Sequence, residues 1–197
     1  MGYTTTNGFQ DLCQAVREGK VVFWVGSGFS EYAGYPTGKD FTKHLQKNLG
    51  IPENEKELLS KVSERFENRE ELLKIIKDVF GKTPENTELH QSLALISQIP
   101  YIITTNYDML FEIAYGDKIK SIADEHELPS TAGTSEKTFI YKIHGDIDHL
   151  DQITITSKDY RDFNKTSILW DKIKTIPAEY SVAFVGFLFR MEMFRNF

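Results

Sequence analysis

The segment VVFWVGSG, residues 21–28, constrains the fold more than any other part of the chain. Five apolar residues, rich in β-branched and aromatic side chains, end abruptly at Gly26. Such a run is too short to cross a membrane and is typical of a strand buried on both faces, as in a parallel sheet. Gly26, Gly28 and Gly34 mark positions where the backbone turns sharply or approaches another group closely. The segment therefore predicts a buried strand that ends in a tight loop.

Short apolar strands and amphipathic helices alternate along the rest of the chain. Beyond the strand at 21–25, the pattern predicts strands over 101–105, 118–123, 138–143, 152–156 and 180–186. It predicts helices over 8–18, 39–49, 85–98, 106–115 and 158–176, and a pair of surface helices within 54–80. This alternation predicts an α/β fold with a Rossmann-like, doubly wound parallel sheet and a helical insertion at about residues 53–82.

Composition narrows the class of protein. The 197 residues, 40% hydrophobic and 26% charged, are typical of one globular domain over 1–197. A net charge of −6 without a long basic cluster gives no electrostatic reason to expect DNA or RNA as a direct partner. Cys13 is the only cysteine, which excludes an internal disulfide. No apolar run has the length of a membrane span and the first 20 residues do not resemble a signal peptide, so we expect a cytoplasmic protein without a membrane partner.

Residues with reactive or ligand-binding side chains follow three of the predicted strands. GSG at 26–28 follows the first strand, TTNYD at 104–108 lies at the end of the next, and HGD at 144–146 follows the strand at 138–143. Parallel α/β sheets bind ligands at the carboxyl ends of their strands. Each group alone has an ordinary explanation: a tight turn, a helix cap with a first-turn acid, or a structural histidine. Their occurrence together at successive strand ends favours a ligand site.

Four motifs, in this order, resemble those of sirtuins. GSGFSEYAGYP at 26–36 is similar to the sirtuin signature G-A-G-x-S-x-x-A-G-[IY]-P, and TTNYD resembles T-Q-N-[IV]-D. KIHG at 142–145 matches the H-G that contains the sirtuin catalytic histidine. FVGF at 184–187 resembles the late strand whose glycine approaches the adenosine. The chain therefore resembles a sirtuin-like domain of the bacterial NAD-consuming type that occurs in anti-phage defence effectors.

The resemblance implies that NAD is bound as a substrate and that no metal is needed. It implies that Asn106 and Asp108 face the nicotinamide ribose and carboxamide. It also implies that His144 bonds the ribose hydroxyls and acts as general base or polariser, a task that an ordinary histidine pKa of about 6.5 suits. The nucleotide would be bound by the glycine loop and by residues at the strand ends, namely Gly26, Ser27, Gly28, Phe29, Ala33, Pro36, Thr105 and Gly186.

The implied reaction is cleavage of the bond between nicotinamide and ribose C1′, with water as the acceptor and ADP-ribose as the second product. Such a reaction passes through an oxocarbenium-like state, which needs positioning and charge stabilisation more than a strong nucleophile. One alternative is a non-catalytic module that binds NAD or ADP-ribose as a sensor or in assembly. A protein deacylase comes last, because one cysteine cannot build the four-cysteine zinc module of classical sirtuins.

Two positions depart from the family pattern. Thr37-Gly38-Lys39 replace the sirtuin D-F-R, and Leu188 replaces a small polar residue that meets the adenosine ribose. The apolar tail FLFRMEMFRNF at 187–197 would be a liability if exposed. We therefore expect a homo-oligomer, a regulatory or sensor chain, or a longer protein of which this is the N-terminal part.

Two further segments have simpler structural readings. YRDFNKTSILW at 160–170 alternates aromatic and basic residues, but it predicts an amphipathic helix packed on the domain rather than a nucleotide-stacking surface. His149 lies among the acidic residues of 146–151, where we expect a solvated loop rather than a cation site, which needs more convergent oxygen atoms.

Overall fold

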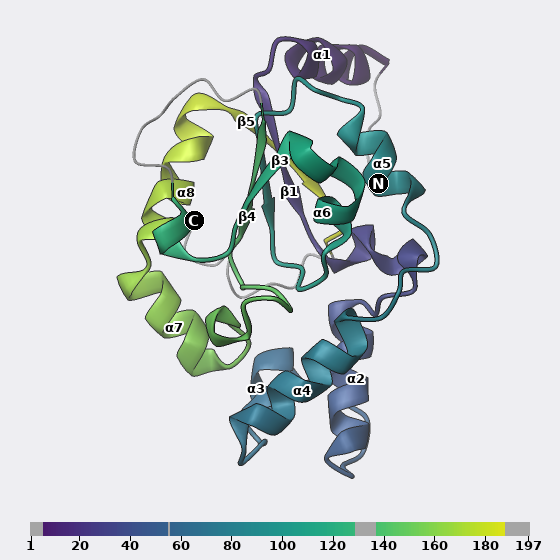
Figure 1. Ribbon diagram of the computed structural model, residues 1–197, viewed down its shortest axis with the longest axis vertical. Coiled ribbons are helices and arrows are strands. Elements are labelled where there is room, and N and C mark those ends of the chain that lie inside the picture. The colour runs from purple at the N-terminus through teal and green to yellow at the C-terminus, as the bar shows by residue number, and fades with distance from the viewer. Residues whose placement is uncertain (1–5, 55, 129–136, 188–197) are drawn as a thin grey trace.

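A five-stranded parallel sheet with helices on both faces forms the centre of the computed structural model, which describes residues 6–54, 56–128 and 137–187 (Figure 1). The strands lie in the order β3-β4-β2-β1-β5 and all four pairings are parallel. Their bounds are β1 Val21–Val25, β2 Tyr101–Thr104, β3 Ile119–Ile122, β4 Thr138–Lys142 and β5 Ser181–Val185. The predicted α/β, Rossmann-like class is confirmed.

Helices cover the two faces of the sheet with separate apolar clusters. The helices are α1 Thr6–Arg17, α2 Gly38–Asn48, α3 Leu59–Ser63, α4 Arg69–Phe80, α5 Glu88–Ala94, α6 Leu110–Tyr115, α7 Ser157–Thr166 and α8 Ile168–Glu179. Figure 1 shows α7 and α8 on one side of the sheet and α5 and α6 on the other. Because side chains alternate along a strand, Trp24 faces α8 while Val25 packs toward α5 and α6.

Each face is built around aromatic rings. On the α8 face, Trp24 meets Trp170 edge-on with ring centroids 6.4 Å apart and stacks on Phe184 at 5.6 Å. On the opposite face, Phe29 stacks with Phe111 at 6.2 Å and meets His90 edge-on at 4.8 Å. These rings bury a large apolar area on both sides, which fixes the sheet and therefore the loops at its carboxyl edge.

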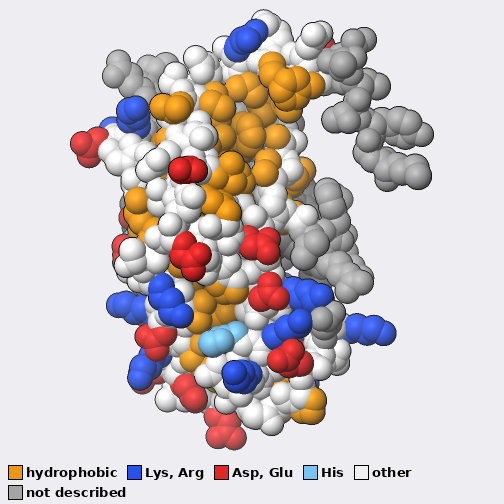
Figure 2. Space-filling model, turned by 90° about the vertical axis from the view of Figure 1, so that its right-hand side faces the viewer, with side chains coloured by type: hydrophobic (Ala, Val, Ile, Leu, Met, Phe, Trp, Pro, Cys, Tyr) orange, Lys and Arg blue, Asp and Glu red, His pale blue; other side chains and the backbone are white. Residues whose placement is uncertain are grey.

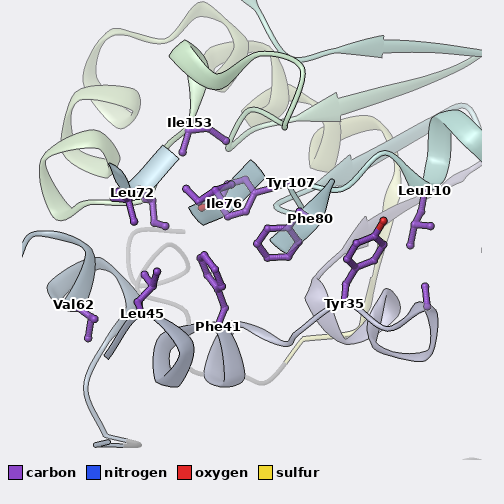
Figure 3. Close-up of a cluster of buried hydrophobic side chains, with 12 residues drawn as sticks. Tyr35, Phe41, Leu45, Val62, Leu72, Ile76, Phe80, Tyr107, Leu110 and Ile153 are labelled. Carbon is purple, nitrogen blue, oxygen red and sulfur yellow. The ribbon is translucent and has the colours of Figure 1, made fainter. Parts of the chain in front are cut away.

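A third apolar cluster joins α2, α3 and α4 to the end of the sheet where the strands stop. Figure 3 shows its side chains, with Phe80 between Phe41 at 5.0 Å and Tyr107 at 5.5 Å between ring centroids. The pair of helices predicted within 54–80 is α3 and α4. We call α2, α3 and α4 together the helical module. This module lies below the carboxyl ends of the strands (Figure 1), so it supports the loops of the candidate site.

The strand predicted over 152–156 is wrong. Residues 150–152 form a 3-10 helix and residues 153–155 pair with no strand among the described residues. The backbone N–H of Thr154 donates to the His144 carbonyl at 3.0 Å, and the Thr154 carbonyl accepts from the Tyr107 hydroxyl at 2.9 Å. Loop and side-chain groups thus satisfy the backbone in place of a sheet ladder.

The alternating pattern that predicted this strand has another cause. Ile153 and Ile155 are buried in the apolar cluster of the helical module. Alternate residues of this segment are therefore buried, although its backbone pairs with no strand among the described residues. The Ile153 carbonyl accepts a hydrogen bond of 2.6 Å from Arg69 on α4. A buried extended segment therefore connects α4 to the sheet.

Three predicted helices differ in their limits. The helix expected over 85–98 is the shorter α5, Glu88–Ala94. The helix expected over 106–115 begins only at Leu110, so Asn106 and Asp108 lie in a loop before it. The helix expected over 158–176 is two helices that meet at Ser167, whose side chain caps α8 by accepting from the Trp170 N–H at 3.1 Å. Ile168, expected to pack on the domain, is exposed.

Candidate active site

The ends of β2 and β4 bring the two predicted catalytic loops together. Thr104 and Lys142, the last residues of these neighbouring strands, are register partners. Asn106 and His144 each lie two residues further along. The Ile143 N–H donates to the Thr104 carbonyl at 3.1 Å, which extends the pairing toward both side chains. The two residues therefore leave the sheet at the same edge.

His144 is buried with one ring nitrogen unsatisfied. Its exposed fraction is 3%, its ring meets Tyr160 edge-on at 5.1 Å, and it forms a hydrogen bond with the backbone carbonyl of Thr105. Nε2 is buried and has no hydrogen-bond partner in the part of the chain that the structure describes. Burial lowers the pKa of His144 to about 3, although the bond to Thr105 opposes this shift. The ring is a neutral imidazole whose Nε2 can accept a proton.

Asn106 is held by its amide nitrogen and leaves its oxygen unsatisfied. Nδ2 donates to Ser30 Oγ at 3.0 Å and to the Gly26 carbonyl at 3.3 Å, while the backbone N–H donates to Thr104 Oγ1 at 3.1 Å. Oδ1 is buried and lacks a hydrogen-bond partner among the described residues. Two acceptors thus fix the orientation of the amide, and its oxygen is available to a donor.

Asp108 is linked to Asn106 through Ser30. Oδ1 of Asp108 accepts from the Leu110 N–H at 3.1 Å, and the Ser30 side chain bonds the same carboxyl group. Burial raises the pKa of Asp108, and the Lys142 charge with the hydrogen bonds from Ser30 and Leu110 opposes this only in part. Ser30 is a site residue that was not predicted, although it is the serine of the motif at 26–36.

The glycine loop packs against the end of β5. The N–H of Gly26 donates to the Val185 carbonyl and that of Gly28 donates to the Gly186 carbonyl, both at 2.9 Å. A Cβ atom on Gly26 would lie 2.8 Å from the Gly186 oxygen. Gly186 has φ +72°, and a Cβ there would lie 2.5 Å from the Phe29 nitrogen. The close approach that these glycines allow is therefore between two backbone segments, and their role in binding a nucleotide stays a prediction.

The remaining predicted binding residues lie around this loop. Ser27 Oγ accepts from the Gly38 N–H at 3.0 Å, so the departure at 37–39 places a glycine where the loop meets the start of α2. Phe29 and Ala33 are buried, whereas Pro36 is half-buried. The Thr105 N–H donates to the Val25 carbonyl at 3.3 Å. Leu188 and the tail at 188–197 lie outside the described residues.

Lys142 and Asp146 are buried charged residues beside these loops. Lys142 is fully buried, and its Nζ lies 3.1 Å from Asp146 Oδ2. Asp146 is 1% exposed, so the solvated loop expected at 146–151 is wrong for this residue. Asp146 is buried because Oδ1 accepts from the N–H groups of Asp148 and His149. A lysine at the end of an apolar strand was the sequence signal for this pair, since lysine is seldom buried without a partner.

The described ranges contain neither a cluster of metal-ligating side chains nor a membrane-spanning helix. No three or more His, Cys, Asp or Glu side chains in these ranges converge as metal ligands would. No helix in them has the length and apolar character needed to cross a membrane.

Comparison with known proteins relates the chain to one group. Residues 100–197 match the family model described as SIR2-like domain. The protein named NAD(+) hydrolase ThsA from Bacillus cereus (strain MSX-D12) is 30% identical over 191 residues, which cover 91% of this chain and 39% of that protein. NAD(+) hydrolase ThsA from Enterococcus faecium is 26% identical over 185 residues, covering 89% and 38%. Defense-associated sirtuin 2 from Bacillus subtilis is 23% identical over 189 residues, covering 90% and 19%. The chain thus spans less than two fifths of the length of each of these relatives.

Proposed function

Because the chain is sirtuin-like and similar to proteins named NAD(+) hydrolase, we propose that it hydrolyses NAD to nicotinamide and ADP-ribose. The observation that supports this most directly is a pair of buried, unpartnered atoms in the described residues, His144 Nε2 and Asn106 Oδ1, on two loops at one edge of the sheet. Buried polar atoms without partners are unfavourable and rare in folded proteins. The hydroxyls of a ribose, the amide of nicotinamide and a water molecule are donors that would satisfy both atoms.

The proposed reaction separates the nicotinamide nitrogen from ribose C1′. The bonding electron pair leaves with the pyridinium ring, which becomes neutral nicotinamide, and the oxygen of water bonds to C1′. Asn106 Oδ1 orients that water. As the water attacks, one of its protons passes to His144 Nε2 and then to solvent. A weakly basic imidazole is sufficient because the departure of the leaving group makes C1′ strongly electrophilic before water attacks.

Asp108 would stabilise the positive charge that develops on the ribose. Its carboxyl lies in a buried, low-dielectric position, where a negative charge acts more strongly than in water. Ser30 holds it beside Asn106, so the charge and the water-orienting amide belong to one hydrogen-bonded group. We propose that this group faces the nicotinamide ribose.

The diphosphate of NAD is proposed to lie along the glycine loop at 26–28. The backbone of Gly28 is exposed, so a phosphate can approach this part of the loop. Since the Gly26 and Gly28 N–H groups bond the end of β5 and a Cβ on either glycine would meet the Gly186 backbone, we propose that these glycines hold the loop against β5 and that the diphosphate lies along its exposed side. Ala33, Pro36 and the other predicted residues of this loop would border the nucleotide.

Nicotinamide release by the purified chain, measured by liquid chromatography, tests the proposal. We expect Asn106→Ala and His144→Ala to lower the rate by about 100-fold or more, because general base and positioning groups contribute on that scale. His126→Ala, at an exposed histidine that belongs to none of the predicted site loops, serves as the matched control and should keep the wild-type rate. Circular dichroism confirms folding, and full activity in both site variants would refute the assignment.

Burial of the site favours one alternative, a module that binds NAD or ADP-ribose without turnover. The exposed fractions of Asn106, Asp108 and His144 are 6%, 2% and 3%, so a nucleotide reaches them only if part of the structure moves. Calorimetric binding of NAD, with no nicotinamide after long incubation of isolated and assembled protein, would favour this function. Protein deacylation ranks last, because Cys13 is the only cysteine in the sequence and a four-cysteine zinc site is impossible.

The biological role that we propose is NAD depletion in bacterial anti-phage defence, in the cytoplasm. An enzyme that destroyed NAD at all times would kill its own host. We therefore propose that activity depends on a homo-oligomer or on a regulatory or sensor domain or chain. Size-exclusion chromatography with light scattering, combined with the nicotinamide assay on each species, tests this dependence.

A further inference from the structure

We propose that Lys142 is a positioning residue that holds the two catalytic loops relative to each other; the inference rests on the proposed NAD hydrolysis. Lys142 ends β4 and is fully buried. Its Nζ donates to the Asp108 carbonyl at 2.7 Å and lies 3.1 Å from Asp146 Oδ2. The first acceptor belongs to the loop of Asn106, and the second follows His144 by two residues.

The ammonium group has as many oxygen neighbours as it has protons. Its third neighbour is Glu112 Oε1 on α6 at 3.2 Å, and Met109 Sδ also lies at 3.2 Å. An ammonium carries three N–H donors and no acceptor. Lys142 therefore donates to one backbone carbonyl and forms ion pairs with two carboxylates, in a position where its own side chain is fully buried.

Backbone hydrogen bonds complete the positions of the two loops that Lys142 contacts. The Lys142 carbonyl accepts from the Gly145 N–H at 3.0 Å, which closes a turn around His144. Gly145 has φ +71°, and a Cβ there would lie 2.7 Å from Gln152, so the turn has little freedom. The bond to the Asp108 carbonyl restrains the loop between Asn106 and α6 in the same way. Lys142 thus fixes both loops without touching the atoms that would meet NAD.

The contact with Glu112 provides a matched control. Glu112 neutralises part of the same charge, but it lies on α6 and belongs to neither loop. Loss of Glu112 removes an ion pair with a partly buried carboxylate and leaves the contacts of Lys142 with Asp108 and Asp146 in place. Loss of Lys142 or of the Asp146 charge removes a link itself. A general effect on stability would appear in all three variants, whereas an effect on positioning would appear only in the last two.

The test compares Lys142→Met, Asp146→Asn and Glu112→Gln in the full chain, with kcat and KM for NAD measured by nicotinamide release. We expect kcat to fall by about 10-fold to 100-fold in K142M and D146N, since small displacements of catalytic groups have effects of that size. KM should change by less than about threefold, because Lys142 does not contact substrate. E112Q should keep kcat within about threefold even where its melting temperature falls.

The kcat of the double variant K142M/D146N should be no lower than that of the worse single variant, because the two substitutions break the same connection. Equal kcat in folded K142M and E112Q would overturn the inference. If K142M does not fold, D146N decides, since its new side-chain amide retains an oxygen that can accept from the N–H groups of residues 148 and 149. Wild-type kcat in D146N would then overturn the inference.

A spectroscopic readout separates this inference from the proposed function. If the wild-type chain binds NAD but releases no nicotinamide, hydrolysis is refuted while positioning is still measurable. The His144 ring and Asn106 side-chain amide resonances should then shift in K142M or D146N and stay in place in E112Q. Unchanged resonances in K142M and D146N would refute the role of Lys142, whatever the activity of the wild type.

Discussion

At the residue scale, burial decides the chemistry that His144 can perform. The sequence alone favoured an imidazole with an ordinary pKa, but the surrounding protein lowers that pKa to about 3. The protonated form is disfavoured because desolvation penalises the charge. His144 is thus a neutral imidazole near neutral pH, and the proposed role depends on the position of Nε2 rather than on a change of charge.

This neutrality predicts the pH dependence of catalysis. We expect kcat/KM for NAD to show no acid limb from His144 between pH 5 and 8, because a group with a pKa of about 3 stays deprotonated throughout that range. Initial rates of nicotinamide release across this range provide the measurement, with circular dichroism at each pH to exclude unfolding. An acid limb centred near pH 6.5 in a folded enzyme would contradict the assigned environment of the ring.

A second residue prediction concerns the junction of the glycine loop with β5. Gly186→Ala should lower the free energy of unfolding by more than about 2 kcal/mol, since a left-handed φ costs an L-residue about 1–2 kcal/mol and the new Cβ would clash with the Phe29 nitrogen. Gly50→Ala is the matched control: its φ is +65° but nothing lies within 4 Å of a Cβ there. Urea unfolding measures both, and equal losses would show that the clash is absent.

At the scale of elements, one arginine joins the helical module to the layer that covers His144. Arg69 at the start of α4 donates to both carboxylate oxygens of Asp159 on α7, at 3.0 and 3.2 Å, and to the Ile153 carbonyl. Asp159 also caps α7 by accepting from the N–H groups of 155 and 156. Tyr160, the next residue, meets the His144 ring. The position of α4 is therefore linked to the surroundings of His144.

Removal of this arginine tests the connection. Arg69→Ala should lower the free energy of unfolding by about 1–2 kcal/mol, the range for hydrogen bonds to a charged group reduced for partial exposure. It should also lower the nicotinamide release rate. Lys61→Ala is the control. It removes the exposed ion pair between Lys61 on α3 and Glu64, and it should change the free energy of unfolding by at most about 0.5 kcal/mol. If both variants unfold at the same urea concentration, Arg69 is only a surface residue.

The elements also show what sequence patterns can and cannot predict. β1, β2 and β4 were predicted because continuous apolar runs in a parallel sheet are buried on both faces. The location of Asn106 and His144 at one edge was predicted because the carboxyl ends of parallel strands lie at the same edge of a sheet. The segment 152–156 failed because alternation reports burial on one side and says nothing of hydrogen-bond partners. Ser30 and Lys142 were missed because their roles depend on contacts between segments distant in sequence.

At the scale of the whole molecule, one face has an apolar region and a charged region. Figure 2 shows hydrophobic side chains gathered in the upper half of one face and charged side chains in the lower half, over the helical module. The exposed large apolar residues include Phe9 and Leu12 on α1, Leu89 on α5 and Ile113 on α6. The carboxyl edge with the candidate site lies toward the charged half of this face, away from its apolar region.

Two buried histidines predict how the stability of the whole fold depends on pH. His90 and His144 have pKa values lowered to about 4 and about 3 by burial. The unfolded chain, with histidine pKa values near 6.5, binds more protons below that pH, so stability falls as the pH drops from about 6.5 toward 4. From pH 7.5 to 5.5 we expect a loss of roughly 1 kcal/mol for each histidine.

Urea unfolding at pH 7.5 and 5.5 measures this loss. His90→Asn keeps an acceptor near the position that Nδ1 occupies against the Tyr32 hydroxyl at 2.8 Å, but it does not titrate. We expect the loss between the two pH values to be smaller in H90N than in wild type by roughly 1 kcal/mol. If H90N loses as much unfolding free energy between pH 7.5 and 5.5 as the wild type does, then His90 protonates as readily in the folded chain as in the unfolded chain.

The pairing of β1 with β5 has a consequence for synthesis of the protein. Val21 and Ser181 are register partners although the other three strands lie between them in the sequence, and the Gly26 and Gly28 amides bond the end of β5. Contacts between such distant residues form late, after the intervening chain has been ordered. A chain still emerging from the ribosome therefore lacks the bonds from the Gly26 and Gly28 amides to the end of β5. The candidate enzyme becomes complete only when its last described strand has left the exit tunnel, which delays any NAD cleavage until after synthesis of this domain.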